Sequence, residues 1–188
     1  TNANSAIDPV KLQRLKDGMR ELPIVSVVLN NEDMFGAAGI YSYPNVNTKG
    51  FPDKACSVEM ILPDGATAFT AACGIGVHGN ASRLPEKNPK HGFKLAFKGE
   101  FGQGSLKYRV FPDSPATEFD DLILRPDFNS SWRHQTDDSS GGGLGAFQRT
   151  RATRTRDAFV KETRRTMGGL GAYNRYCHLF INGLYWGT

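Results

Sequence analysis

The sequence predicts an α+β fold, with a mostly antiparallel sheet of about five or six strands, one long packed helix and a short N-terminal helix. Three observations support this class. A hairpin signal at Asp64-Gly65 joins two strand-like segments, the run FKLAFK over 93–98 alternates like a strand, and a helical pattern extends from about Arg154 to Met167. A chain of 188 residues suits one domain over 1–188, with 1–22 as a helical extension.

The N-terminal helix is predicted from its start and stop signals. Asp8 is a typical N-cap residue and Pro9 a typical first helical residue, and Pro23 ends the pattern. One apolar stripe follows at spacings of three and four residues: Leu12, Leu15, Met19 and Leu22. The next segment, IVSVVLN over 24–30, is apolar and β-branched, which indicates a strand.

The segment CSVEMILPDGATAFTAAC over 56–73 is predicted to form a hairpin. If Asp64 and Gly65 form a two-residue loop, counting outward places Cys56 directly opposite Cys73. Facing strand residues can approach the separation that a disulfide requires, so the pair is either a disulfide or two buried thiols. The chain has three cysteines, and we expect Cys177 to be a separate buried thiol.

The remaining elements are predicted from turn residues and alternation. Residues 31–54 are turn-rich and should be irregular. In 93–98 one face is apolar, and DLILRPDF over 121–128 is a strand that stops at Pro126. Gly168-Gly169 should close the long helix, and Asn182-Gly183 should make a turn within the last strand.

Basic residues concentrate in one stretch of a chain whose net charge is +4. They are Arg149, Arg151, Arg154, Arg156, Lys161, Arg164 and Arg165. This pattern indicates either a solvated helix face or a phosphate site. Nucleic acid is not expected as a partner, because the stretch holds a single aromatic residue, Phe159. No run of about 18 apolar residues is present, so no membrane-spanning segment is predicted.

The loop after the Cys56–Cys73 hairpin has the residues of an anion site. Gly76 and Gly79 allow the backbone to approach a ligand closely, and Arg83 and Lys94 supply positive charge from a loop and a strand. The alternative is a surface turn whose arginine and lysine point apart into solvent.

Four motifs in order resemble the first half of a CotH-type domain, over roughly residues 22–188. They are GIGVHGNASRLPEKNPKHGFKLAFK, FDDLILRPDFNSSW, RDAFVKETRRTMGG and RYCHLFINGLYWGT. This family contains the spore-coat protein kinases and related secreted bacterial proteins. The resemblance implies a lobe like the N-terminal lobe of kinases, the cofactors ATP and Mg²⁺, and a secreted or cell-envelope location, although the chain carries no signal peptide.

The resemblance also implies roles for matching residues. The loop over the phosphates is Gly76, His78, Gly79, Asn80, Ser82 and Arg83. Lys94 would contact the nucleotide phosphates and would be held by an acid of the long helix, Asp157 or Glu162, as a strand lysine pairs with a helix glutamate in kinases. Arg125, Asp127 and Asn129 match a strand-end motif of the family. The structural alternative is that these residues only make the turn.

The family's metal-binding and catalytic aspartates lie beyond the NGLYWG motif, at which this chain ends, so residues 1–188 alone are expected to bind phosphate without transferring it. The first alternative is a small hydrolase of an ester or lactone, with His78, Ser82 and Asp127 as catalytic residues and calcium as an optional ion on Asp127, Asp137 and Asp138. His91, His134 and His178 are further candidate bases. No Gly-x-Ser-x-Gly elbow supports the hydrolase.

The second alternative is a non-catalytic module that binds an anion or a partner. The last strand is strongly apolar, which predicts self-association through it. Its apolar residues are Phe180, Ile181, Leu184, Tyr185 and Trp186.

Overall fold

The computed structural model describes residues 8–84, 90–126 and 151–188, and it confirms the α+β class. The helices are α1 (Pro9–Glu21), α2 (Asn31–Phe35), η1 (Asn45–Asn47), η2 (Ala81–Arg83) and α4 (Arg156–Thr166). The strands are β1 (Ile24–Leu29), β2 (Lys54–Ile61), β3 (Thr67–His78), β4 (Gly92–Ala96), β5 (Leu106–Lys107), β6 (Glu118–Phe119), β7 (Asp121–Leu124), β8 (His178–Ile181) and β9 (Leu184–Gly187).

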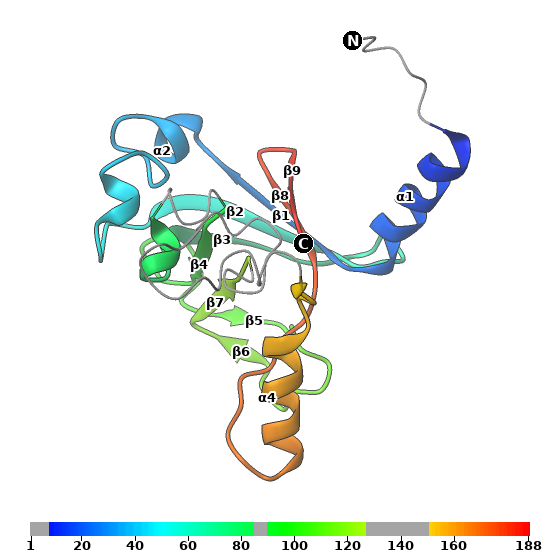
Figure 1. Cartoon of the computed structure of the whole chain (residues 1–188). Coiled ribbons are helices and arrows are strands. Elements are labelled where there is room, and N and C mark those ends of the chain that lie inside the picture. The colour runs from blue at the N-terminus through cyan, green and yellow to red at the C-terminus, as the bar shows by residue number, and fades with distance from the viewer. Residues whose placement is uncertain (1–7, 85–89, 127–150) are drawn as a thin grey trace. The chain divides into compact units, whose positions relative to one another are not determined.

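Seven strands form one sheet in the order β7-β4-β3-β2-β1-β8-β9, and β5 pairs with β6 separately (Figure 1). The pairs β3/β4, β4/β7 and β8/β9 are antiparallel, whereas β1 and β8 are parallel. The sheet is therefore larger than expected, mainly because the C-terminal segment contributes two strands. The chain divides into two compact units, which are described in turn: 1–28 with 58–70 and 176–188, and 29–57 with 71–175.

In the first unit, α1 begins and ends where its signals predict. The Asp8 carboxylate accepts a hydrogen bond from the Val10 N–H at 3.0 Å, and Pro9 is the first helical residue. No residue of α1 is buried, and Leu15 is 58% exposed. The apolar stripe is therefore not part of a core.

The C-terminal hairpin of this unit turns at the predicted residues. Asn182 and Gly183 both have positive φ, at 49° and 78°, as a two-residue type I′ turn requires. β1 and β8 bury Val27 and Ile181 at paired positions. The His178 ring is also buried, with Nδ1 3.2 Å from the Tyr185 hydroxyl and Nε2 3.0 Å from the Gly18 carbonyl. His178 thus contacts α1 and the hairpin rather than presenting a free base.

The loop of the β2–β3 hairpin has three residues, whereas two, Asp64 and Gly65, were predicted. The Leu62 N–H donates to the Ala66 carbonyl, and the Gly65 N–H donates to the Leu62 carbonyl, so the loop is Pro63 to Gly65. Pro63 stands second in this turn and Gly65 last, with φ of 87°. Proline favours the second turn position and glycine the left-handed last one, which stabilises the three-residue form.

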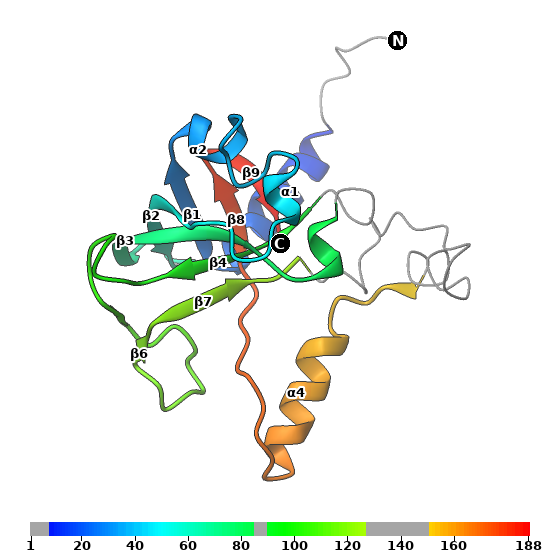
Figure 2. The same cartoon turned by 90° about the vertical axis from the view of Figure 1, so that its left-hand side faces the viewer.

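In the second unit, β4 lies between β3 and β7 (Figure 2). Its alternation is confirmed, because Phe93, Leu95 and Phe97 are at most 1% exposed. Ala96, on the other face, is also fully buried, and Lys94 beside it is half-buried. Both faces of β4 are therefore covered to some extent, which places Lys94 in a partly buried setting.

The basic helix α4 ends at the predicted glycines. The Gly168 N–H donates to the Arg165 carbonyl and the Gly169 N–H to the Arg164 carbonyl, which is a Schellman motif with Gly168 at φ of 81°. The following segment returns along the helix (Figure 2), where the Arg165 guanidinium donates to the Ala172 carbonyl at 2.6 Å. None of the residues of α4 is buried, although a packed helix was expected.

Cys56 Sγ and Cys73 Sγ, in the second unit, are 3.4 Å apart as free thiols. Their predicted approach is confirmed, although the loop from which their pairing was counted has one more residue than predicted. Cys177 is half-buried rather than buried. Within the three described ranges, no helix has the length and hydropathy needed to cross a membrane.

Candidate anion-binding site

A cavity of about 320 Å³ in the second unit is lined by the end of β3, the loop after it, β4 and the segment before β2. Its basic side chains are Lys49, His78, Arg83 and Lys94. Apolar side chains of Ile40, Val46, Phe51 and Val77 also line it, and Asp53 is the one carboxylate among its described lining residues. The structure thus brings Gly79, Arg83 and Lys94 to one cavity, where the loop was expected to hold an anion.

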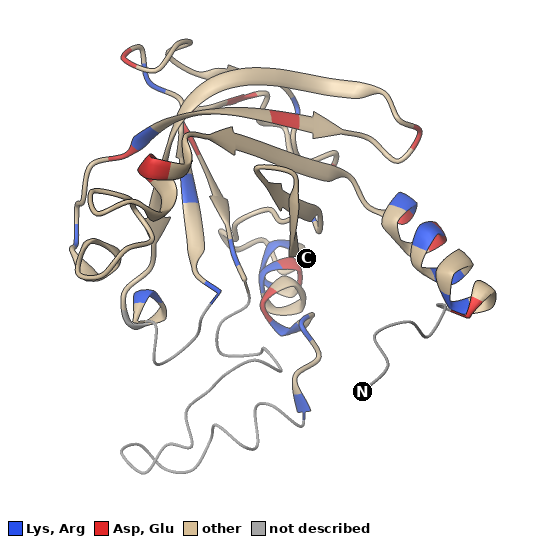
Figure 3. Cartoon of the chain, turned by 90° about the horizontal axis from the view of Figure 1, so that it is seen from above, with Lys and Arg blue, Asp and Glu red and all other residues tan. Residues whose placement is uncertain are grey.

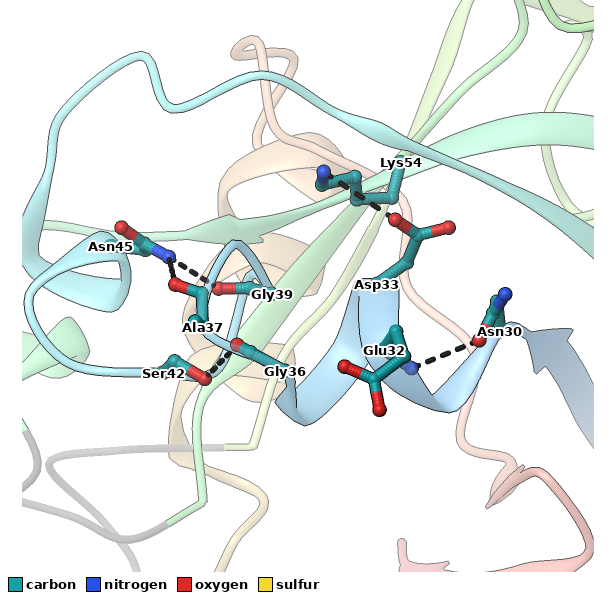
Figure 4. A network of polar contacts seen from close by, with 9 residues as sticks. All are labelled: Asn30, Glu32, Asp33, Gly36, Ala37, Gly39, Ser42, Asn45 and Lys54. Carbon is teal, nitrogen blue, oxygen red and sulfur yellow. Dashed lines mark hydrogen bonds and ion pairs between the residues drawn. The ribbon is translucent and has the colours of Figure 1, made fainter.

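The irregular segment that forms one wall is held by its own hydrogen bonds (Figure 4). The Ser42 hydroxyl reaches the Gly36 carbonyl at 2.5 Å, and the Asn45 amide donates to the carbonyls of Ala37 and Gly39 at 2.9 and 3.0 Å. An ion pair of 3.4 Å joins Lys54 to Asp33. This wall is therefore ordered by side chains, although it contains little regular structure.

Asp53 occupies the space that the missing side chain of Gly76 leaves. A Cβ atom at Gly76 would overlap the Asp53 carboxylate. Gly76 is paired with Lys94 across β3 and β4, so the same carboxylate contacts the Lys94 ammonium at 3.2 Å and the Lys98 ammonium at 3.6 Å. The side chain of Asp53 is only 11% exposed. Gly76 therefore serves the site by admitting Asp53 beside Lys94.

Arg83 is the most deeply placed cation of the site. It is 8% exposed, and its Nη1 donates to the Thr48 carbonyl at the long distance of 3.4 Å. Its Nε, also buried, has no hydrogen-bond partner among the described residues. Buried polar groups are usually paired, so this guanidinium has donor capacity that the described protein does not use.

The loop that carries Arg83 is held by Gly79 and His91. Gly79 has φ of 129°, and a side chain there would overlap the Ser82 hydroxyl. The Ser82 carbonyl lies 3.0 Å from Nδ1 of the buried His91, whose ring packs 4.6 Å from that of Tyr41. Burial lowers the pKa of His91, and the hydrogen bond that its ring donates to the Ser82 carbonyl opposes this shift. His91 therefore holds the loop in place, with its ring neutral at neutral pH.

The pKa of His78 is lowered by its surroundings in the site. Its side chain is largely exposed, but partial burial lowers its pKa, and the charges of Arg125, Lys94 and Arg83 lower it further. The Asp121 carboxylate opposes the shift. A neutral His78 at the mouth of a cationic cavity can donate or accept a hydrogen bond without adding charge.

The expected pair between Lys94 and an acid of the long helix is not formed. Asp157 accepts from Arg125 at 3.0 Å and from Lys161 at 2.6 Å, and Glu162 pairs with Arg165. The acid beside Lys94 is Asp53, because the β3–β4 register sets Lys94 opposite Gly76, over which Asp53 lies. The two helix acids instead neutralise nearby basic residues.

The hydrolase residues are only partly described. No hydrogen bond joins His78 to Ser82 in the described part of the chain, and the Ser82 hydroxyl lies against Gly79. Asn80 contributes its carbonyl to the N–H of Arg83 at 3.1 Å. Asp127, Asn129, Asp137 and Asp138 lie outside the described residues. The catalytic set thus stays a prediction.

Three features of the cavity are not predicted by the sequence: Lys49, Asp53 and the apolar side. Except for Val77 on β3, all of these residues come from the turn-rich segment 31–54, whose composition predicts turns but not which strand residues its side chains contact. One local signal existed, since Asp53 directly precedes a strand that begins with a lysine.

Comparisons with family models, with curated proteins and with solved structures found no match. The resemblance to CotH-type domains therefore depends on the four motifs alone.

The donors of the cavity fit an anionic group. Three permanent cations and a histidine surround it, and its described carboxylate already contacts two ammonium groups. Nor do the described residues gather three or more His, Cys, Asp or Glu side chains suited to a metal. The described lining thus fits an anionic group such as a phosphate, but it does not by itself fit a Mg²⁺ ion, which prefers carboxylate and phosphate oxygens.

Proposed function

We propose that the cavity binds the phosphate group of a ligand and that the ligand is a nucleotide. The observation that carries the proposal is the buried guanidinium of Arg83, with an Nε atom that no described residue satisfies. A buried donor without an acceptor costs free energy, and a phosphate bound against Arg83 would supply an acceptor once the side chain turns its Nε toward the cavity.

The charges around the cavity support this ligand class. Lys49, Arg83 and Lys94 contribute positive charge, and Asp53 offsets part of it. The pKa of His78 is lowered first by burial and then by the charges of Arg125, Lys94 and Arg83, which agrees with a positive potential at the cavity. An anion in the cavity would gain from a partly desolvated site in which the cations are already positioned.

The apolar side of the cavity favours a ligand that carries an organic group as well as a phosphate. Phe51 and the aliphatic side chains of Ile40, Val46 and Val77 offer a surface for a nucleoside. ATP is the nucleotide that the CotH-type resemblance implies, with Mg²⁺ entering on its phosphates. In this proposal the chain supplies nucleotide binding, and phosphoryl transfer additionally needs the catalytic acids that the family carries beyond the NGLYWG motif.

Titration calorimetry with inorganic phosphate and with ATP, with and without magnesium, tests the proposal. Arg83→Ala should weaken phosphate binding about 10- to 100-fold, because a hydrogen bond to a charged group contributes about 1.5–3 kcal/mol. Arg109→Ala, at an exposed arginine away from the cavity, is the matched control. Because Arg83→Ala could perturb the loop, Lys49→Ala, at an exposed cavity lysine, is a second test and should weaken binding several-fold.

Three other results would contradict the proposal. Absence of phosphate and ATP binding by the wild-type protein at millimolar ligand would mean that the loop over 76–83 is only a turn. Binding that neither Arg83→Ala nor Lys49→Ala changes would place the anion elsewhere, such as on the basic helix. Hydrolysis of an ester or lactone that His78→Ala abolishes would favour the hydrolase.

We also propose that β9 pairs with a second copy of the chain. β9 is an edge strand, and its Leu184 and Tyr185 are 66% and 51% exposed. Exposed apolar edges favour strand pairing, and a charge on them opposes it. Light scattering should show an oligomer that Leu184→Lys converts to a monomer, with the exposed Leu170→Lys as control. A wild-type monomer at high concentration would contradict this proposal.

A further inference from the structure

Two thiols meet inside the second unit, between neighbouring strands of the sheet. Cys56 on β2 and Cys73 on β3 have their Sγ atoms 3.4 Å apart, and their exposures are 8% and 0%. The sulfur atoms of a disulfide are about 2.05 Å apart, so a small rotation of the side chains would close the bond. Cys177 lies in the first unit and is not part of this pair.

We infer that Cys56 and Cys73 are a site of disulfide formation, which cross-links β2 and β3 when the protein meets a thiol–disulfide oxidant such as oxidised glutathione. The inference is independent of the phosphate-binding proposal. It concerns a covalent modification that the hydrogen-bonded thiols are placed to undergo.

The reaction takes two balanced steps. The Cys56 thiolate, the more accessible of the two, attacks a sulfur of oxidised glutathione, so that a mixed disulfide forms and one glutathione thiolate leaves. The Cys73 thiolate then attacks the Cys56 sulfur and releases the second glutathione. Two electrons pass from the cysteines to the oxidant, and the two thiol protons end on the glutathione products.

The surroundings of the pair set the conditions of the first step. The hydrogen bond with Cys73 raises the pKa of Cys56, and burial and the charges of Cys73 and Asp53 raise it further. The same hydrogen bond lowers the pKa of Cys73, which burial opposes. Cys56, the thiol that the oxidant can reach, therefore keeps its proton at neutral pH. Since the thiolate is the nucleophile, oxidation should be slow at neutral pH and faster in alkaline solution.

The position of the pair connects it to the cavity wall. Cys56 follows Asp53 by three residues, and Cys73 precedes Gly76 by three. Asp53 lies directly over Gly76, so the disulfide would tie together the two segments that form this contact. A cross-link there restrains the unfolded chain and should raise the thermal midpoint of unfolding.

The test uses the whole chain in glutathione buffers of increasing oxidation. Trypsin leaves both cysteines on the peptide 55–83 and Cys177 on 176–188. In the oxidised protein, 55–83 should lose the mass of two hydrogen atoms and resist alkylation. Cleavage at Met60 should then separate its halves only after reduction, and the thermal midpoint should rise.

Matched variants make the result decisive. Cys177→Ser should behave as the wild type, whereas Cys56→Ser and Cys73→Ser should show neither the cross-link nor the rise in midpoint. Because a serine at a buried site could unfold the protein, Cys56→Ala gives a second removal of the thiol. Alkylation of all three thiols in denaturant after prolonged oxidation of the native protein, or a disulfide to Cys177, would overturn the inference.

Discussion

The helix α4 and the cavity are both basic, but they use their cations differently. On α4, Lys161 pairs with Asp157, Arg165 pairs with Glu162 and stacks on Tyr173, and the charges of both signs alternate along the helix (Figure 3). In the cavity, the buried Arg83 keeps an Nε without a partner in the described chain. The density of Lys and Arg in a sequence thus does not show which cations are already paired. Our proposal of an anion site in the cavity depends instead on the donors that the described chain leaves unused.

The largest effect is expected from filling the space at Gly76. Gly76→Ala would push the Asp53 carboxylate from its place beside Lys94 and Lys98. We expect the free energy of unfolding to fall by about 1–3 kcal/mol, as for other overpacked sites. Urea denaturation measures it, with Gly99→Ala as control because nothing lies within 4 Å of its added Cβ. Equal stability of the two variants would mean that the Asp53–Gly76 contact is not tight.

A second comparison between the cavity and α4 removes one carboxylate from each. Asp53→Asn removes the carboxylate that competes with a ligand for Lys94, so phosphate should bind roughly fivefold more tightly, the equivalent of about 1 kcal/mol for charges 4 Å apart in water. Asp157→Asn, on α4, should leave phosphate affinity unchanged. Calorimetry of both variants decides this. Weaker binding by Asp53→Asn would show instead that Asp53 positions Lys94.

A smaller effect is expected on α4, where the ion pairs are local and exposed. Lys161→Ala removes the pair with Asp157 four residues earlier, and such pairs contribute about 0.2–0.5 kcal/mol. The free energy of unfolding should fall by that amount, and phosphate affinity should stay at the wild-type value. A loss of phosphate affinity with Lys161→Ala would move the anion site towards the helix.

The smallest expected effect is the pH dependence that His78 contributes. Its folded-state pKa is lowered, so the unfolded chain binds the proton more readily. Stability from this group is therefore present above the unfolded pKa of about 6.5 and is lost as the pH falls through that value towards the folded pKa. Comparison of wild type with His78→Gln in urea denaturation at pH values from neutral to mildly acidic isolates this term. A wild-type protein that gains stability relative to His78→Gln on acidification would contradict it.

The sequence by itself determined the caps and turns, whose hydrogen bonds join residues only a few positions apart. The Asp8 cap, the Gly168-Gly169 helix end and the Asn182-Gly183 turn all formed where they were predicted. Each depends on one side chain or one positive φ value and on hydrogen bonds to near neighbours, so the local residues carry the whole signal. The alternation over 93–98 similarly predicted the face of β4 that buries Phe93 and Leu95, although Ala96 on the other face is buried as well.

Only the tertiary structure decided which charged groups meet. Lys94 was expected to pair with α4, but Asp53 reaches it from a segment about 40 residues earlier, through the space above Gly76. The depth of Arg83 likewise depends on a wall whose residues 40–53 carry no strand or helix pattern that points to the cavity. Sheet register and the space left by neighbouring side chains decide which distant residues form an ion pair. Neither can be predicted from the residues next to either partner in the sequence.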